Sequence, residues 1–352
     1  MTSSIDRRYL LQAAVALAAT ATLPRSLRAA NIAFAGIPRS AYGFATTCDE
    51  VAEGYDLSGL TVLITGCNSG LGYESMRTLA AHGAHVIGTA RNRGKAQEAC
   101  ASVAGKTTPL ACELTDMQSV VDCSNAVLAL DVPIDVLMCN AGIMALPKLE
   151  QVTILVAGKP VLLEKQFVVN HLGHYLLARR LLPRVEAALA GRIVMLSSTG
   201  YTLAPREGIQ FDNLSGEQGY KPFTAYGQTK LANALFSLEL SRRYADSSLT
   251  SNAVHPGMVA TDLGRYITGK ARDPNAPLRK GFKTPVQGAA TQVYCAIDRR
   301  LKGVSGYYFE DCNPVQMEGP NPADTVLAAR LWQVSEVLVQ DYLGSDPGKS
   351  LK

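Results

Sequence analysis

The sequence predicts an α/β fold built on a single doubly wound parallel sheet with helices on both faces. From about residue 60 onward, short apolar runs of strand length alternate with longer segments of helical periodicity. Runs such as 61–65 and 134–139 carry apolar residues on both faces, which is typical of parallel strands covered on both sides. Right-handed crossovers between such strands place ligands at the carboxyl ends of the sheet.

Each element follows from this alternation. Strands are predicted at 61–65, 85–90, 108–112, 134–139, 192–197, 251–255 and 306–309. Helices are predicted at 70–82, 93–103, 116–130, 163–184 and 224–244. No internal repeat or low-complexity tract interrupts the series, so we expect one domain over 60–345, preceded by an extension over 36–59.

The composition limits the function. A chain of 352 residues with 47% apolar and 18% charged residues can bury a large core, which excludes a globally disordered protein. The net charge is only +4, and no basic stripe is interleaved with aromatic residues. Nucleic acid is therefore not expected as a partner. Self-association into a homo-oligomer stays open.

The cysteines and histidines give no sign of a metal site. Eight cysteines are spread along the chain, at 48, 67, 100, 112, 123, 139, 295 and 312. None forms a Cys-x-x-Cys pair and several stand in apolar runs, so we expect buried, reduced thiols. His171 and His174 have no carboxylate or cysteine beside them to complete a site, so no metal is predicted.

The N-terminus resembles a twin-arginine export signal over residues 1–35. Arg7 and Arg8 precede a weakly apolar stretch that ends near Leu23, and Ala33-Phe34-Ala35 offers a small-x-small cleavage site. The stretch is too short for a standard membrane span, so no transmembrane segment is predicted. Export as a folded protein would place the chain in the periplasm. The alternative is a retained N-terminal helix and a cytoplasmic protein.

A glycine-rich turn joins the first predicted strand to the first helix. It comprises Thr65, Gly66, Cys67, Asn68, Ser69, Gly70, Leu71 and Gly72. Glycines permit a tight turn and close approach to a pyrophosphate, while the helix N-terminus supplies N–H donors. In this strand–turn–helix context the motif predicts a Rossmann-type dinucleotide site; the alternative is an ordinary turn.

The end of the second predicted strand bears on which dinucleotide is bound. A carboxylate there would accept hydrogen bonds from the ribose 2′-OH of NAD. This chain instead has Ala90 followed by Arg91, whose guanidinium can pair with a 2′-phosphate. NADP(H) is therefore favoured over NAD(H), the alternative being an ordinary exposed arginine at a strand end.

A second group of residues suggests proton transfer. Tyr226 and Lys230 lie four residues apart in a predicted helix, so both side chains share one face. A nearby ammonium favours the phenolate and is expected to lower the pKa of the tyrosine. Ser197 and Ser198 end an apolar strand, where a hydroxyl can face the ligand. Alone, this tyrosine–lysine pair is more often structural, and a serine there can be a helix N-cap.

Together with three further motifs, the region from about 60 to 343 resembles the classical short-chain dehydrogenase/reductase family. The further motifs are Cys139-Asn140-Ala141-Gly142, Asn170 within 167–174, and His255-Pro256-Gly257 with Thr261. Residues 50–58, 170–174 and 230–236 resemble a subgroup that contains retinol dehydrogenases, WW-domain oxidoreductases and a plastid short-chain dehydrogenase associated with protein import. Cys139 and Glu113 depart from the family pattern, and neither has a proton-transfer role.

The resemblance implies a role for each matched residue. Tyr226 would exchange a proton with the substrate oxygen, Ser198 would hydrogen-bond that oxygen, Lys230 would assist Tyr226 and hold the cofactor, and Asn170 would position a water. The cofactor would be held by Gly66, Asn68, Ser69, Gly70, Leu71, Gly72, Arg91, Glu113, Leu114, Asn140, Ala141, Gly142, Tyr226, Lys230, Pro256, Gly257 and Thr261.

The expected activity is interconversion of a carbonyl and an alcohol on a hydrophobic or medium-sized small molecule, with NADP(H). Segments 142–149, 199–223 and 263–282 are expected to line the substrate pocket. Two alternatives stay open, a non-catalytic NADP(H)-binding regulator and a C=C reductase of the protochlorophyllide-reductase type. The intact set of Asn170, Ser198, Tyr226 and Lys230 argues against the regulator.

Overall fold

The computed structural model describes residues 36–273, 276–319 and 321–344. Its main sheet has eight strands in the order β10-β9-β8-β7-β4-β1-β2-β3, and all pairs except β9–β10 are parallel. The strands are β1 (Thr61–Ile64), β2 (His85–Ala90), β3 (Thr107–Ala111), β4 (Val136–Cys139), β7 (Arg192–Leu196), β8 (Thr250–His255), β9 (Tyr308–Glu310) and β10 (Asn313–Pro314). The expected doubly wound α/β fold is confirmed.

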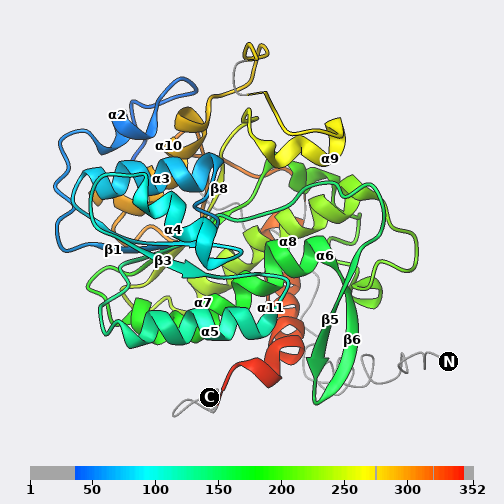
Figure 1. The fold of residues 1–352 in the computed structure, drawn as a ribbon. Coiled ribbons are helices and arrows are strands. Elements are labelled where there is room, and N and C mark those ends of the chain that lie inside the picture. Colours follow the sequence, from blue (N-terminus) through cyan, green and yellow to red (C-terminus); the bar gives the residue numbers. More distant parts are fainter. Residues whose placement is uncertain (1–35, 274–275, 320, 345–352) are drawn as a thin grey trace.

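Helices cover both faces of this sheet (Figure 1). One layer contains α2 (Cys48–Ala52), α3 (Gly70–Ala81), α4 (Arg93–Ala101) and α10 (Pro285–Ile297). The other contains α5 (Met117–Ala129), α7 (Gly173–Glu186), α8 (Pro222–Arg243) and α11 (Thr325–Val339). A separate hydrophobic cluster fills the space on each side of the sheet. Because the order reverses between β1 and β4, the carboxyl ends of these two strands flank the expected ligand crevice.

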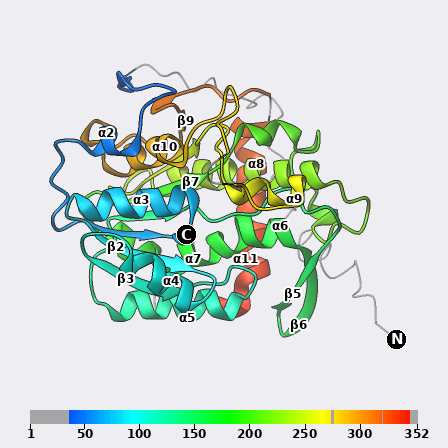
Figure 2. The ribbon, with the colours of Figure 1, turned by 45° about the horizontal axis from the view of Figure 1, so that its top comes forward.

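The 36–59 extension packs against the domain. Thr47 caps α2 through a reciprocal capping box with Glu50. Val51, Ala52 and Leu57 are buried in the cluster shared with α3 and α10. Figure 2 shows α2 beside α3 and α10, and this segment therefore adds apolar surface to the core that the three helices share.

The predicted helix over 163–184 is wrong at its N-terminal end. Residues 163 and 164 belong to β6 (Lys159–Glu164), which pairs antiparallel with β5 (Gln151–Val156) in a two-stranded hairpin. The Glu164 side chain then accepts from the Phe167 N–H and caps the short helix α6 (Lys165–Phe167). A π-helical turn over Val168–Leu172 joins α6 to α7.

The hairpin lies beside α11 and extends from the body of the molecule (Figure 1). At its turn, the N–H groups of Ala157 and Gly158 donate to the Asp341 carboxylate at 3.0 and 2.7 Å. Its strands did not stand out in the sequence because outward-facing Leu155 and Leu162 are apolar as well, which hides the alternation.

All eight cysteines are free and buried, as expected. Among the described residues, no helix is both long and apolar enough to span a membrane. The predicted export signal, residues 1–35, lies outside the described part of the chain.

Candidate active site

The glycine-rich turn follows the carboxyl end of β1 and leads into α3. Gly66 and Gly70 have positive φ angles of 74° and 60°, which favour glycine. A Cβ on Gly72 would lie 2.3 Å from the Gly66 carbonyl oxygen, so the turn can close only without a side chain there. Ser69 is the N-cap of α3, but its side chain makes no capping hydrogen bond. The turn and the first N–H groups of α3 thus suit an anion such as a pyrophosphate.

Asn140 ties the end of β4 to this turn. Its side-chain amide donates to the Thr65 carbonyl at 2.8 Å and lies 3.4 Å from the Gly66 carbonyl. The backbone N–H groups of Asn140 and Ala141 both donate to the Thr65 hydroxyl, at 2.9 and 3.0 Å. The Asn140-Ala141-Gly142 segment and the glycine turn are therefore one hydrogen-bonded unit.

Tyr226 and Lys230 both lie on α8 and are buried, and they face the end of β7. The Lys230 Nζ lies 5.5 Å from the centre of the Tyr226 ring and donates to the Leu196 carbonyl at 3.1 Å. Ser198 follows β7 as the N-cap of a 3-10 helix over Thr199–Leu203, accepting from the Gly200 N–H. The structure thus brings Ser198, Tyr226 and Lys230 together.

Burial controls the ionisation of this group. It raises the pKa of Tyr226 to about 12, and a hydrogen bond with Ser198 acts in the opposite direction. Burial lowers the pKa of Lys230 to about 8. The net shift of Tyr226 is upward, opposite to the expected effect of the adjacent lysine, because desolvation of the phenolate outweighs its hydrogen bonding.

Asn170 lies in the π-helical turn and is fully buried. Its amide is paired on both sides with the backbone of Ile143: the oxygen accepts from the N–H at 2.8 Å, and the nitrogen donates to the carbonyl at 2.9 Å. A Cβ on Gly142 would lie 3.2 Å from the Asn170 Oδ1 and 3.8 Å from the Lys230 Nζ. Asn170 is thereby adjacent to the tyrosine–lysine group through Gly142.

Other predicted cofactor residues follow the carboxyl ends of neighbouring strands of the same sheet. Arg91 follows β2 and is exposed. Glu113 follows β3, but its carboxylate accepts from the N–H and hydroxyl of Thr115 at 3.0 and 2.9 Å. Leu114 is buried, and a Cβ on Gly173 would lie 2.9 Å from the Leu114 carbonyl oxygen, so Leu114 has a packing role.

The Pro256-Gly257 loop follows β8 and approaches the glycine turn. A Cβ on Gly70 would lie 3.4 Å from the Thr261 methyl carbon, so Thr261 stands over the start of α3. The Lys283 side chain packs against this loop, because a Cβ on Gly257 would lie 3.0 Å from it. The Lys283 ammonium is paired with Asp311. The supporting lysine carried no motif in the sequence that could have identified it.

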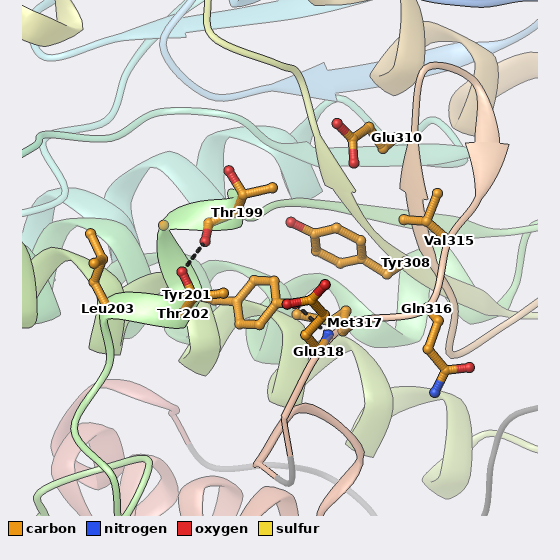
Figure 3. A pocket seen from close by; sticks show the side chains of 11 residues that line it. Thr199, Tyr201, Thr202, Leu203, Tyr308, Glu310, Val315, Gln316, Met317 and Glu318 are labelled. Atoms are coloured by element: carbon orange, nitrogen blue, oxygen red, sulfur yellow. Dashed lines mark hydrogen bonds between the residues drawn. The ribbon is translucent and has the colours of Figure 1, made fainter.

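Figure 3 shows a pocket of about 450 Å³. It reaches the Tyr226 ring through Gly200, which lines the pocket and on which a Cβ would lie 2.9 Å from the Tyr226 Cε1. One wall is the 199–203 segment, which belongs to a segment expected to line the substrate site. The opposite wall, Tyr308, Glu310 and residues 315–318, was not predicted. The hydroxyl of Tyr201 accepts from the Glu318 N–H and joins the two walls (Figure 3).

The two histidines of the 170–174 motif point to different partners. His171 contacts Ser335 at 2.9 Å and packs among Phe167, Tyr175 and Phe236. His174 lies 2.8 Å from the Thr65 hydroxyl. Within the described ranges, no group of three or more His, Cys, Asp or Glu side chains is arranged to hold a metal ion.

Comparison with known proteins shows the family to which the chain belongs. The sequence model described as short chain dehydrogenase matches residues 60–271. The chain is 38% identical to the short-chain dehydrogenase TIC 32 B, chloroplastic, of Brassica napus, with 86% of this chain and 95% of that protein covered. It is 36% identical to human WW domain-containing oxidoreductase (88% and 75% covered) and to human retinol dehydrogenase 14 (80% and 87% covered).

Solved structures agree. An uncharacterized protein from Mycobacterium paratuberculosis superposes with a TM-score of 0.62 at 32% identity, covering 82% of this chain and 97% of that one. A short chain dehydrogenase/reductase family protein superposes with a TM-score of 0.52 at 28% identity, covering 72% and 96%. The chain belongs to the short-chain dehydrogenase/reductase family, in the subgroup of these relatives. It is an oxidoreductase of a family that uses a nicotinamide cofactor.

Proposed function

We propose that the protein interconverts a carbonyl and an alcohol with NADP(H), with Tyr226 as the general acid and base. The observation that carries this proposal is the meeting of Ser198, Tyr226 and Lys230 beside the glycine turn. The three residues come from β7 and α8, while the turn comes from β1 and α3. These four elements meet at the carboxyl ends of the parallel strands.

The residues divide the chemistry as follows. A nicotinamide cofactor, when bound, would supply or accept the hydride. Tyr226 holds its proton at neutral pH, since burial raises the pKa of its phenol to about 12, and we propose that this proton passes to the substrate oxygen. The Ser198 hydroxyl hydrogen-bonds the same oxygen and stabilises charge that develops on it. Lys230 would hold the cofactor ribose, and Asn170 keeps the adjacent 141–143 segment in place through its two hydrogen bonds to Ile143.

Arg91 supports the preference for NADP(H). It is exposed at the carboxyl end of β2, and Ala90 stands where a ribose-binding carboxylate would be. An exposed guanidinium at this point can form charge-assisted hydrogen bonds with a 2′-phosphate.

The pocket suggests the kind of substrate. Its walls combine the rings of Tyr201 and Tyr308 and the apolar side chains of Leu203 and Met317 with polar groups. We infer a medium-sized, largely hydrophobic carbonyl compound. The part of the substrate remote from the reacting carbon would lie between the 199–203 segment and residues 315–318.

We also propose that the chain is exported by the twin-arginine route. Arg7, Arg8 and the short apolar stretch behind them support this. Eight buried thiols suit a domain that folds in a reducing compartment before export.

The experiment that tests the enzymatic proposal is turnover against a broad panel of aldehydes, ketones and alcohols, with NADPH or NADP⁺ followed by absorbance. We expect reduction or oxidation of at least one hydrophobic member. Tight NADPH binding without turnover of any member would instead favour a non-catalytic binding protein.

A further inference from the structure

We propose that His174 is a positioning residue: its neutral ring holds the cofactor turn and the Asn170 carbonyl in fixed register. This inference rests on the proposed function, because the turn matters only if a dinucleotide binds there. The ring spans two elements. Its Nε2 lies 2.8 Å from the Thr65 Oγ1 at the end of β1, and its Nδ1 lies 3.0 Å from the Asn170 carbonyl oxygen.

The hydrogen bonds around Thr65 determine which ring nitrogen carries the proton. A hydroxyl has two acceptor positions and one donor. Both acceptor positions of the Thr65 hydroxyl are filled by the N–H groups of Asn140 and Ala141. Its hydrogen must therefore point to the His174 Nε2, which accepts. The proton of the neutral ring is then on Nδ1, where it donates to the Asn170 carbonyl.

Burial keeps the ring in this neutral form. His174, Thr65 and Asn170 are at most 1% exposed. Desolvation lowers the pKa of His174 to about 4; the hydrogen bond to the Asn170 carbonyl acts in the opposite direction, and the charge of Lys230 makes a smaller downward contribution. A second ring proton would meet the Thr65 hydroxyl hydrogen, so the charged form would break the contact with Thr65.

These contacts close a ring of hydrogen bonds around Gly142. This closed circuit begins at the Thr65 hydroxyl, which accepts from the Ala141 N–H, and follows the chain to Ile143, whose N–H donates to the Asn170 side-chain amide. The Asn170 carbonyl then contacts the His174 imidazole, which contacts the Thr65 hydroxyl and closes the circuit. Gly142 is the member of this ring that faces the Lys230 ammonium. His174 is thus the only side chain in this ring that joins the Asn170 turn to the end of β1.

The first test is the tautomer of His174 in the wild-type protein, read from ¹⁵N chemical shifts of the imidazole nitrogens at neutral pH. We expect a protonated Nδ1 and an unprotonated Nε2. A protonated Nε2, in the neutral or the charged ring, would overturn the inference. This measurement requires neither cofactor nor substrate.

The second test compares NADPH affinity, by calorimetry, in three variants of the full chain. His174→Phe keeps an aromatic ring but leaves the Thr65 hydroxyl and the Asn170 carbonyl without their partner in a dry interior. We expect its NADPH dissociation constant to rise about tenfold or more. His174→Gln offers one donor and one acceptor and should restore affinity to within about threefold of wild type.

His171→Phe is the matched control, since His171 is equally buried three residues away but contacts Ser335 and the aromatic cluster instead. It should lower the melting temperature without changing NADPH affinity. Wild-type affinity in His174→Phe, or equal weakening in His174→Phe and His174→Gln, would overturn the inference. If His174→Phe does not fold, the inference is still tested by the His174 tautomer in the wild-type protein and by the NADPH affinity of His174→Gln. Wild-type protein that binds no nicotinamide dinucleotide would overturn the proposed function and, with it, this role.

Discussion

Gly200 lies against the edge of the Tyr226 ring: a Cβ at Gly200 would be 2.9 Å from the Tyr226 Cε1 and 3.3 Å from the Ser198 Oγ. The absence of a side chain at position 200 therefore allows the tyrosine and the serine to meet. Gly200 also lines the pocket, so the pocket wall and the proton-transfer group share this contact.

We predict that Gly200→Ala lowers turnover by about 10²-fold, the cost of a misplacement of about 1 Å in an active site. The added methyl would push the tyrosine ring or the serine hydroxyl from its place, while the backbone at this position accepts alanine. Gly43→Ala is the control, because nothing lies within 4 Å of a Cβ there. Turnover in Gly200→Ala equal to that of wild type would show that the contact has no catalytic consequence.

The burial of Lys230 is expected to destabilise the folded protein by an amount that depends on pH. Its pKa falls from 10.5 to about 8 on folding. Below the folded-state pKa, Lys230 is protonated in both the folded and the unfolded chain, and burying its charge lowers the free energy of unfolding by the full amount, about 3 kcal/mol. Between the two values the unfolded chain keeps its proton while the folded chain has lost it, so stability rises with pH.

Lys230→Met should therefore be more stable than wild type by up to about 3 kcal/mol at pH 7, and by only about 1 kcal/mol at pH 9.5. Asn233 still donates to the Leu196 carbonyl in this variant, at 2.9 Å, so that group keeps a partner. Urea unfolding at both pH values measures the difference. A gap that does not change with pH would contradict the buried-ammonium explanation.

The Arg91 assignment predicts a cofactor preference. Wild-type protein should bind NADPH more tightly than NADH, and Arg91→Ala should weaken NADPH binding by about 10- to 100-fold, the value of a charge-assisted hydrogen bond, without changing NADH binding. Arg184→Ala serves as the control, because Arg184 is a partly exposed arginine on α7 that pairs with Asp131. Equal affinity of the wild-type protein for both dinucleotides would remove the basis for the NADP(H) assignment.

The export proposal is tested by fractionating cells that express the full chain or an Arg7→Lys/Arg8→Lys double variant. Export predicts a shortened protein with its N-terminus near residue 36 in the periplasm, absent with the double variant. Uncleaved protein in the cytoplasm for both chains would end the export proposal and leave the enzymatic one intact.

Much of the sheet could be predicted because its central strands are continuous apolar runs bounded by turns. The strand over His85–Ala90 agrees with its prediction at both ends. Helices α10 and α11 were missed, although Thr284 with Gln287 forms a capping box and Asp324 caps α11. Both capping signals are present in the sequence and mark where these two helices begin.

The site was predictable as a set of residues but not in its electrostatics. Spacing alone indicates that Tyr226 and Lys230 share a helix face. It cannot show that α8 is buried along this face, and burial raises the pKa of Tyr226. The connection of His174 to Thr65 was also beyond the sequence, because it joins residues that are 109 positions apart.

The most direct test of the account is the turnover of Tyr226→Phe on an authentic substrate found in the carbonyl panel, measured alongside NADPH binding. The substitution keeps the ring and its packing against Gly200 and removes only the hydroxyl. We predict a loss of turnover of about 10²-fold or more, the contribution of general acid–base catalysis, with NADPH affinity unchanged. Near-wild-type turnover in Tyr226→Phe would contradict the assignment of Tyr226 as the proton donor and acceptor.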